Sequence, residues 1–209
     1  MSDIRDQILD AALPDIVFDG WTQGVLERAA QRTGLSAVDV KRSFPGGAVD
    51  ALDYFTERAD RRMLESLERD FSMSDLKIRE RIATAVMVRL RQNQPYREAV
   101  RRGLAVYALP WHAAEGLKRL YATVDAMWHA AGDTSTDYNF YTKRLLLSKV
   151  YMTTLYVWLD DATPDLADTE AFLRRRIENV MQIEKLKAKA REGLSAFETW
   201  LPPSLRRGA

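Results

Sequence analysis

Apolar residues recur at steps of three and four along almost the whole chain, which is the spacing of one face of an α-helix. The first such stripe ends near Gly20, and no segment keeps the alternation of apolar and polar residues that a half-buried strand shows. This stripe consists of Ile4, Ile8, Leu9, Ala12, Ile16 and Val17. The pattern therefore predicts an all-α protein of about nine or ten helices.

Capping and helix-breaking residues give the expected helix limits. Thr22 and Ser36 stand just before apolar-periodic segments and are good N-caps. Pro95 suits a first helical turn, and Pro110 breaks the chain again. Longer helices are expected over about Ala48–Phe71, Ser74–Asn93, Ala113–Ala131, Asp137–Asp160 and from about Asp168 onward. We expect a three-helix head (1–47), a larger helical body (48–182) and a C-terminal amphipathic helix and tail (183–209).

Composition narrows the class of protein. The 209 residues are 46% apolar and 29% charged, as in an ordered soluble protein. There is no cysteine, which excludes disulfides, thiolate metal sites and cysteine nucleophiles. The longest nearly apolar run, residues 145–159, has 15 residues. Because a membrane-spanning helix needs about 18 or more, this run is expected to form a buried core helix.

The stretch "GWTQGVLERAAQRTGLSAVDVKRSFPGG", Gly20 to Gly47, contains a turn "RTGLS" and an end "FPGG". In spacing it resembles the helix-turn-helix of TetR-type regulators, with Phe44 in the place of the closing aromatic residue. However, residues 1–50 carry five basic and eight acidic side chains, a net charge of −3. Since DNA affinity depends on neutralising phosphates, we expect a TetR-like head without DNA binding. A TetR-type transcriptional regulator with a small-molecule pocket is the alternative function.

Three aromatic residues begin the helix that follows "AGDTSTD", namely Tyr138, Phe140 and Tyr141. Helical periodicity allows Tyr138 and Tyr141 to be a core pair, with the preceding polar residues acting only as caps. Phe140 points roughly 200° away from Tyr138 and shares a face with Arg144. An aromatic residue beside an arginine at a polar surface is typical of a protein-contact hot spot. The pattern leaves both interpretations open.

A longer segment, Trp128 to Met181, contains "AGD.STD.N.YTKR", "T..VWL.D.TPD" and "FL..RI..V" in that order. In this it closely resembles the ubiquinone (coenzyme Q) biosynthesis accessory protein family, a lipid-binding offshoot of the TetR-like fold. One departure is Phe140, where relatives often have tryptophan.

The resemblance implies a protein with no catalytic chemistry and no cofactor. Such a protein binds a polyisoprenoid quinone intermediate at the membrane and presents it to a di-iron demethoxyubiquinone hydroxylase. The resemblance also implies a homodimer, formed through the last two long helices. By the same resemblance, the residues that contact the hydroxylase are Asp137, Asn139, Phe140, Tyr141 and Arg144.

The lipid would need a long apolar cavity, because water must be kept from its prenyl chain. The helix expected over about Ala113–Ala131 and the run Leu145–Leu159 of the next helix are rich in leucine, methionine and aromatic residues, which suit an adaptable cavity. The candidates are Leu117, Tyr121, Val124, Trp128, Tyr151, Met152, Leu155 and Trp158. The competing interpretation is that these residues form a dry core.

Apolar residues of the C-terminal segment recur at helical steps, with lysines in other directions. Residues 185–209 carry six basic and two acidic side chains, a net charge of +4. An amphipathic helix of this kind suits a lipid headgroup interface, although packing on the domain or on a dimer mate is the alternative. The expected membrane-binding residues are Leu186, Leu194, Phe197, Trp200 and Leu201.

Nothing specific in the sequence favours an enzyme or a metal site. His112 and His129 lack the spacing of metal ligands, and there is no GxSxG or P-loop motif. The acidic loop, residues 160–170, is explained by helix termination and N-capping at Asp165 or Asp168. The first ten residues form neither a signal nor a transit segment. We expect a bacterial cytoplasmic protein, peripheral on the inner membrane, or a mitochondrial matrix-side protein if the chain is processed.

Overall fold

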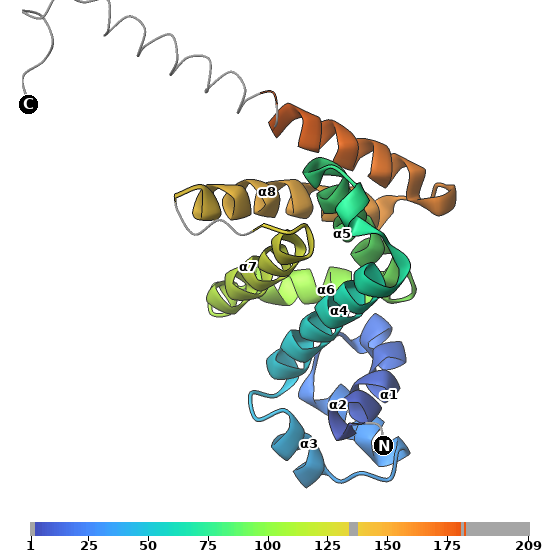
Figure 1. Cartoon of the computed structure of the whole chain (residues 1–209). Helices are drawn as coiled ribbons and strands as arrows, with labels where there is room; N and C mark the ends of the chain where they lie inside the picture. Colours follow the sequence, from blue (N-terminus) through green and yellow to red (C-terminus); the bar gives the residue numbers. More distant parts are fainter. Residues whose placement is uncertain (1–2, 134–137, 181, 183–209) are drawn as a thin grey trace, which may run out of the picture.

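The computed structural model describes residues 3–133, 138–180 and 182, and within these ranges it contains helices and turns but no strand (Figure 1). The all-α prediction is therefore confirmed. The helices are α1 (Ile4–Asp19), α2 (Gln23–Arg32), α3 (Ala37–Ser43), α4 (Ala48–Asp70), α5 (Ile78–Gln92), α6 (Arg97–Tyr107), α7 (Ala113–Ala130) and α8 (Tyr138–Asp160). Another helix covers residues 167–180. Short 3-10 turns lie at Met73–Asp75, Gln94–Tyr96 and Pro164–Leu166.

The predicted caps of the head are in place. The Thr22 hydroxyl accepts a hydrogen bond from the Val25 amide at 3.4 Å. Ser36 and Asp39 form a reciprocal capping box, with the Ser36 amide donating to the Asp39 carboxylate at 2.9 Å. Asp39 lies in the first turn of α3, the last helix of the helix-turn-helix-like segment, and its carboxylate is used to start that helix.

The core of the head continues beyond α3. Buried residues of α1, α2 and α3 pack against Leu52 and Phe55 of α4 and Ala99 of α6. The Trp21 indole donates a hydrogen bond to the Ala99 carbonyl at 2.9 Å. Figure 1 shows the long helix α4 running from the head into the rest of the molecule. The expected boundary after residue 47 thus marks a turn in the chain, while side-chain packing crosses it.

A second core fills the body. It is built from α4, α5, α7, α8 and the helix over residues 167–180, and its fully buried members include Met63, Leu90, Met127 and Trp158. The Trp158 indole donates to the Gln94 side-chain carbonyl at 3.0 Å, so its one polar atom is satisfied inside the core. These helices form the frame on which the candidate site is built.

Helix α8 differs from the buried core helix that we expected over residues 145–159. One face is buried, but Leu145 is 72% and Tyr156 is 58% exposed. The apolar side chains of residues 145–159 therefore extend beyond the face of α8 that the neighbouring helices bury. No helix in the described ranges is long and apolar enough to span a membrane.

The acidic loop is organised by Asp161, and the expectation of capping by Asp165 or Asp168 was wrong. The Asp161 carboxylate accepts hydrogen bonds from the amides of Thr163 and Thr169 at 2.8 and 2.9 Å, and from both hydroxyls at 2.5 Å. Burial opposes the charge of this carboxylate, but the four hydrogen bonds lower its pKa to about 2. Asp161 thus ties the end of α8 to the first turn of the helix over residues 167–180.

Candidate functional site

A cavity of about 370 Å³ lies among α4, α5, α6, α7 and α8. This volume is within the range of small-molecule sites. Most of its wall is apolar, and the contributing side chains are Leu52, Phe55, Val100, Leu104, Leu117, Leu120, Met152 and Leu155. The cavity therefore suits an apolar ligand.

Two glycines inside helices allow the walls to approach closely. A Cβ atom at Gly103 of α6 would lie 2.7 Å from Leu52 Cδ1, and one at Gly116 of α7 would lie 2.7 Å from Tyr107 Cβ. Such contacts are too short for any other residue without movement of the neighbours. Glycine at these positions brings α6 against α4 and α7 against α6.

The cavity has an open end and a buried end. Leu117 and Tyr156 line it and are 67% and 58% exposed, so the cavity reaches the surface between α7 and α8. Its other lining residues include four buried polar side chains, Arg89, Asn93, Thr123 and Tyr151. We call the first end the mouth and the second the inner end.

An ion pair organises the inner end. Arg89 Nε donates to Asp60 Oδ1 at 2.7 Å, and Arg89 Nη1 donates to the Tyr151 hydroxyl at 2.6 Å. The Thr123 hydroxyl donates to Asp60 Oδ2 at 2.9 Å. Burial by itself would lower the pKa of Arg89, but the attraction of Tyr151 and Asp60 raises it above its ordinary value. Arg89 therefore stays charged, and Asp60 balances it.

A second group of polar side chains lies along the α4–α6–α7 wall. The Tyr107 hydroxyl donates to Asp53 Oδ1 at 2.5 Å. Arg119 forms ion pairs with Asp53, at 3.3 Å, and with Glu57. Burial and the hydrogen bond to Asp53 raise the pKa of the Tyr107 phenol. Since the arginines of both groups are paired with carboxylates, the cavity presents little net charge to a ligand.

The start of α8 carries an aromatic pair on a buried arginine. The Arg144 guanidinium carbon lies 3.3 Å from the centroid of the Phe140 ring. The Phe140 and Tyr141 rings meet edge to face with their centroids 5.2 Å apart, and Tyr141 is 66% exposed. We call Phe140 and Tyr141 the aromatic surface.

Arg144 itself is not at the surface, since its side chain is 1% exposed. Its Nε donates to Asp125 at 2.5 Å and its Nη1 donates to Asp133 at 3.2 Å. Asp133 also pairs with Lys143 at 2.7 Å. Arg144 thus supports the aromatic surface from beneath.

Comparison with known proteins shows which proteins this chain is related to. A sequence profile of the COQ9 family matches residues 113–184, a range that begins with α7 and includes α8. The human protein named "Ubiquinone biosynthesis protein COQ9, mitochondrial" is 34% identical over 186 residues, which are 86% of this chain and 58% of the human protein. The protein of the same name from Rattus norvegicus is 36% identical over 186 residues, again 86% of this chain, and 59% of the rat protein. This chain is a homologue of the COQ9 proteins.

The chain thus spans less than two thirds of the length of these COQ9 relatives. Its fold also matches a solved structure, the TetR transcriptional regulator from Nitrosomonas europaea, with a TM-score of 0.69. The match covers 83% of this chain and 95% of the regulator, at 24% identity. It confirms the TetR-like fold expected from the sequence.

The structure of this COQ9 homologue brings together four of the eight expected pocket residues, namely Leu117, Tyr151, Met152 and Leu155. Trp128 lines a separate cavity of about 340 Å³ beside α5, α8 and Ile177. Val124 and Trp158 are fully buried in the body core. Tyr121 is half-exposed and is not among the residues that line the cavity.

The sequence analysis did not identify the cavity-lining residues of α4 and α6 or the polar residues of the inner end. Arg89 is one of four arginines in α5, with Arg79, Arg81 and Arg91, and nothing in its position along the sequence marks it as the buried one. Gly103 and Gly116 were usable signals, because a glycine within a helix usually has a packing reason. Their meaning could not be assigned without knowing which helices pack there.

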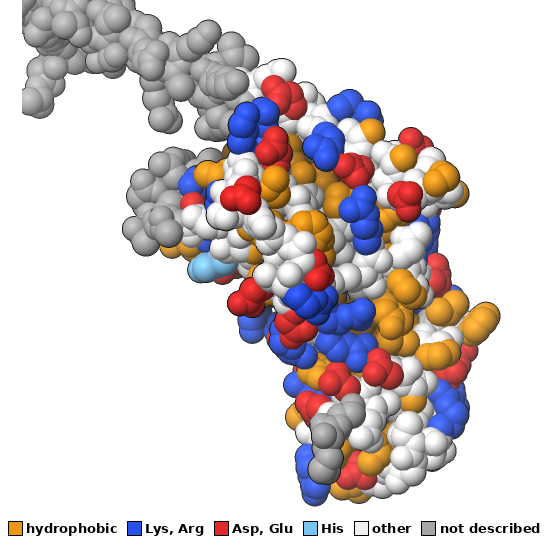
Figure 2. Space-filling view, turned by 45° about the vertical axis from the view of Figure 1, so that its right-hand side comes forward, with side chains coloured by type: hydrophobic (Ala, Val, Ile, Leu, Met, Phe, Trp, Pro, Cys, Tyr) orange, Lys and Arg blue, Asp and Glu red, His pale blue; other side chains and the backbone are white. Residues whose placement is uncertain are grey.

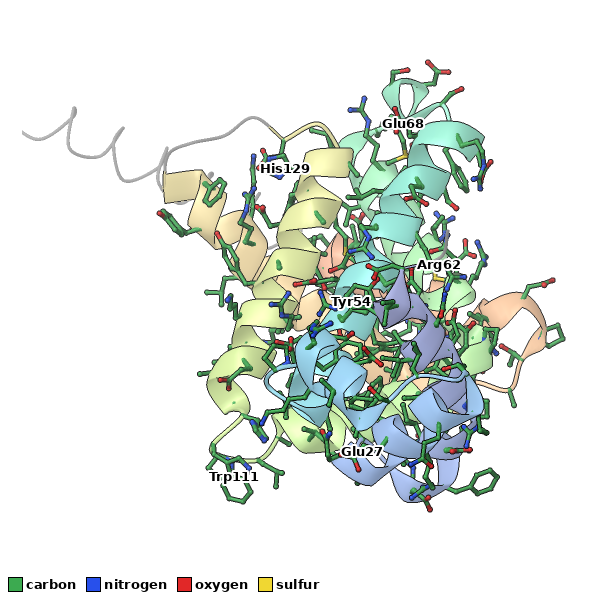
Figure 3. The ribbon with its side chains drawn as sticks, turned by 90° about the horizontal axis from the view of Figure 1, so that it is seen from below. Glu27, Tyr54, Arg62, Glu68, Trp111 and His129 are labelled. Carbon is green, nitrogen blue, oxygen red and sulfur yellow. The ribbon has the colours of Figure 1, made fainter. Side chains whose placement is uncertain are left out.

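Several expected site residues lie outside the described structure. These are Asp137, the side chain of Asn139, and the C-terminal residues Leu186, Leu194, Phe197, Trp200 and Leu201. Within the described ranges, no three carboxylate or imidazole groups gather where they could hold a metal ion. His112 follows Trp111 at the start of α7, while His129 lies at the other end of that helix (Figure 3).

Charged side chains of the head form ion pairs with one another. Arg28 pairs with Asp19, and Arg32 pairs with Asp15 at 2.8 Å. Lys41 and Arg42 of α3 are exposed. Figure 2 shows acidic and basic side chains interspersed over the visible face of the molecule. On the visible face of the described head, basic side chains therefore do not form a stripe of the kind that follows a phosphate backbone.

Proposed function

We propose that this COQ9 homologue is a non-catalytic accessory protein of ubiquinone biosynthesis. It binds a polyisoprenoid quinone intermediate in the cavity among α4–α8 and presents that lipid to the di-iron demethoxyubiquinone hydroxylase. The observation that carries the proposal is the apolar cavity, which opens at the surface between Leu117 and Tyr156.

The energetics of the cavity favour a neutral lipid. Transfer of apolar surface out of water is favourable by about 25 cal/mol per Å², so a prenyl chain gains from contact with this wall. The arginines at the wall, Arg89 and Arg119, are already paired with carboxylates. An ionised ligand would find no free counter-charge there, whereas a neutral one disturbs no ion pair.

Extraction of the purified protein followed by mass spectrometry tests lipid binding. We expect an isoprenoid quinone or its precursor from the wild type and much less from Met152→Trp, whose indole would fill the cavity. Ala122→Trp places the same side chain at an exposed position of α7 outside the cavity lining and serves as the control. A wild type free of isoprenoid lipid, or equal lipid in both variants, would contradict the cavity assignment.

The aromatic surface is the proposed contact with the hydroxylase. The exposed Tyr141 ring packs edge to face on Phe140, and the Phe140 ring lies on the buried Arg144 guanidinium. Rings held in place in this way are a preorganised anchor, which lowers the entropy cost of association. We expect Phe140→Ala to abolish hydroxylase binding in a pull-down while helical content stays unchanged. Lys118→Ala, at an exposed position of α7 away from the proposed α8 contacts, is the matched control. Unaltered binding by Phe140→Ala would defeat the assignment.

The C-terminal helix and tail, residues 183–209, are proposed to bind the membrane surface. The support is their sequence, with a net charge of +4 over residues 185–209 and apolar residues at helical steps. The protein would then be peripheral on the inner membrane, on the cytoplasmic side in a bacterium or the matrix side in a mitochondrion. Liposome flotation with and without residues 185–209 tests this role, which equal binding would refute.

A homodimer through α8 and the helix over residues 167–180 completes the proposal. The exposed apolar side chains of α8, including Leu145, are compatible with such a contact. Light scattering on the purified protein should give twice the monomer mass, and a monomer at high concentration would exclude the dimer.

A further inference from the structure

The inner end of the cavity contains a buried hydrogen-bond donor that no described residue uses. Tyr151 is 4% exposed, and its hydroxyl oxygen accepts a hydrogen bond from Arg89 Nη1 at 2.6 Å. Within the described residues, no acceptor takes a hydrogen bond from the Tyr151 hydroxyl itself. A buried donor without an acceptor is costly and is rarely left in that state. Because Tyr151 lines the cavity, its missing acceptor is expected to come from whatever the cavity holds.

The surroundings of Tyr151 define the charge of that acceptor. Asp60 lies 2.7 Å from Arg89 and also accepts from Thr123, so the positive charge at the inner end is already balanced. A carboxylate or phosphate on the ligand would be buried without a free cation. A neutral oxygen, such as a quinone carbonyl or a methoxy group, needs only the donor. Burial raises the pKa of the Tyr151 phenol, which keeps the proton on this donor at neutral pH.

The helices give the ligand a direction. On α8, Tyr156 at the mouth and Tyr151 at the inner end are five residues apart, or about 7.5 Å along the helix. On α7, Leu117 at the mouth and Thr123 at the inner end are six residues apart, or about 9 Å. Continuing along α8, the aromatic surface begins ten residues before Tyr151, about 15 Å further on. The inner end thus lies between the mouth and the aromatic surface.

We infer that the ligand enters with its oxygen-bearing ring first, that the Tyr151 hydroxyl donates a hydrogen bond to a neutral oxygen of that ring, and that the prenyl tail extends toward the mouth. This inference rests on the proposed lipid-binding function and adds the ligand's polarity and orientation to it. It places the ring on the side of the cavity nearest the aromatic surface. The chemical class selected is an apolar molecule with a neutral hydrogen-bond acceptor at one end.

Two probes with the same tail test the inference. One is a dimethoxybenzoquinone that carries two prenyl units, and the other is the corresponding hydrocarbon, a benzene ring with the same two units. We expect the wild type to bind the quinone about tenfold more tightly, as one buried hydrogen bond provides. Tyr151→Phe should remove most of this preference and leave hydrocarbon affinity within about twofold of the wild type. Tyr121→Phe, on α7 and outside the cavity lining, should keep the preference.

The outcomes separate the inference from the function on which it rests. If the wild type binds neither probe, the proposed lipid-binding function fails and the inference falls with it. If the wild type binds both probes equally, or if Tyr151→Phe keeps the preference, only the inference is overturned.

Vibrational spectroscopy provides a readout that a folding defect in Tyr151→Phe would not mimic. Hydrogen bonding weakens the quinone C=O bond, so its stretching band should move to lower wavenumber when the wild type binds. Bands that stay where they lie in an apolar solvent would overturn the inference.

Discussion

Two regions of this COQ9 homologue are each organised by a buried arginine, and the same side chain serves opposite purposes in them. At the inner end of the cavity, Arg89 joins Asp60 and Tyr151. Beneath the aromatic surface, Arg144 joins Asp125 and Asp133 and carries the Phe140 ring on its guanidinium plane. Arg89 makes the inner end of the cavity polar, whereas Arg144 supports aromatic rings at the surface of the molecule.

The two regions differ in the chemical group that remains available for binding beside each arginine. At the inner end, the Tyr151 hydroxyl accepts from Arg89 but donates to no acceptor among the described residues, which suits a small ligand. At the aromatic surface, the exposed group is the ring of Tyr141, which suits a protein partner. The neighbours of a buried charge therefore decide which chemical group each region offers to a binding partner.

Removal of Arg89 should have the largest effect. Arg89→Ala leaves the carboxylate of Asp60 buried, with only Thr123 as a partner, so we expect the free energy of unfolding to fall by about 3–5 kcal/mol. Urea denaturation followed by circular dichroism measures this change. If the loss is below 1 kcal/mol, the ion pair does not organise the inner end. Arg89→Met combined with Asp60→Asn should be less damaging than Arg89→Ala, since no charge is then left unpaired.

Removal of Arg144 should cost less. Asp133 keeps its contact with Lys143, and Asp125 is partly exposed, so Arg144→Ala should reduce the free energy of unfolding by about 2 kcal/mol. It should also weaken hydroxylase binding, because the Phe140 ring loses its support. A stability loss equal to that of Arg89→Ala would show that the two regions are energetically alike.

Asp161 tests whether a buried charge needs an ion pair at all. Its carboxylate is held by hydroxyl and amide groups, and its pKa is about 2, below the ordinary value of 3.8. A folded-state pKa below the unfolded one contributes stability above pH 4, and this contribution is lost as the pH falls toward 2. The contribution is about 2 kcal/mol. Wild type and Asp161→Asn, compared by thermal unfolding between pH 2 and 6, should converge at the acid end; a constant difference would contradict this account.

Tyr141→Ala should have the smallest effect on stability. The side chain is 66% exposed, so the free energy of unfolding should change by no more than about 0.5 kcal/mol. Hydroxylase binding, measured by surface plasmon resonance, should weaken by about tenfold or more, as expected for an aromatic hot spot. Unchanged binding would remove Tyr141 from the proposed contact and leave Phe140 to be tested alone.

The helices and their starts could be predicted from the chain because both depend on neighbours within a few residues. Thr22 and Ser36 cap the helices that follow them because each side chain reaches an amide only three residues away. The family relationship was also visible, since the order of short motifs in residues 128–181 belongs to the chain itself. Where local alternatives competed, as in the acidic loop, the prediction chose Asp165 or Asp168 although Asp161 does the capping.

The cavity and the burial of its polar groups depended on contacts between distant segments. Asp60, Arg89 and Tyr151 come from three helices, and no spacing along the chain announces that they meet. Periodicity placed Phe140 and Arg144 on one face of a helix, but it could not tell that Arg144 is buried beneath carboxylates from the preceding helix and loop. The sequence by itself thus determined the helical elements and the kinship of this protein, because these rest on local spacing and on residue order. Only the tertiary structure decided which side chains form a wall, a buried ion pair or an exposed ring, because burial is set by whichever helix packs against each face.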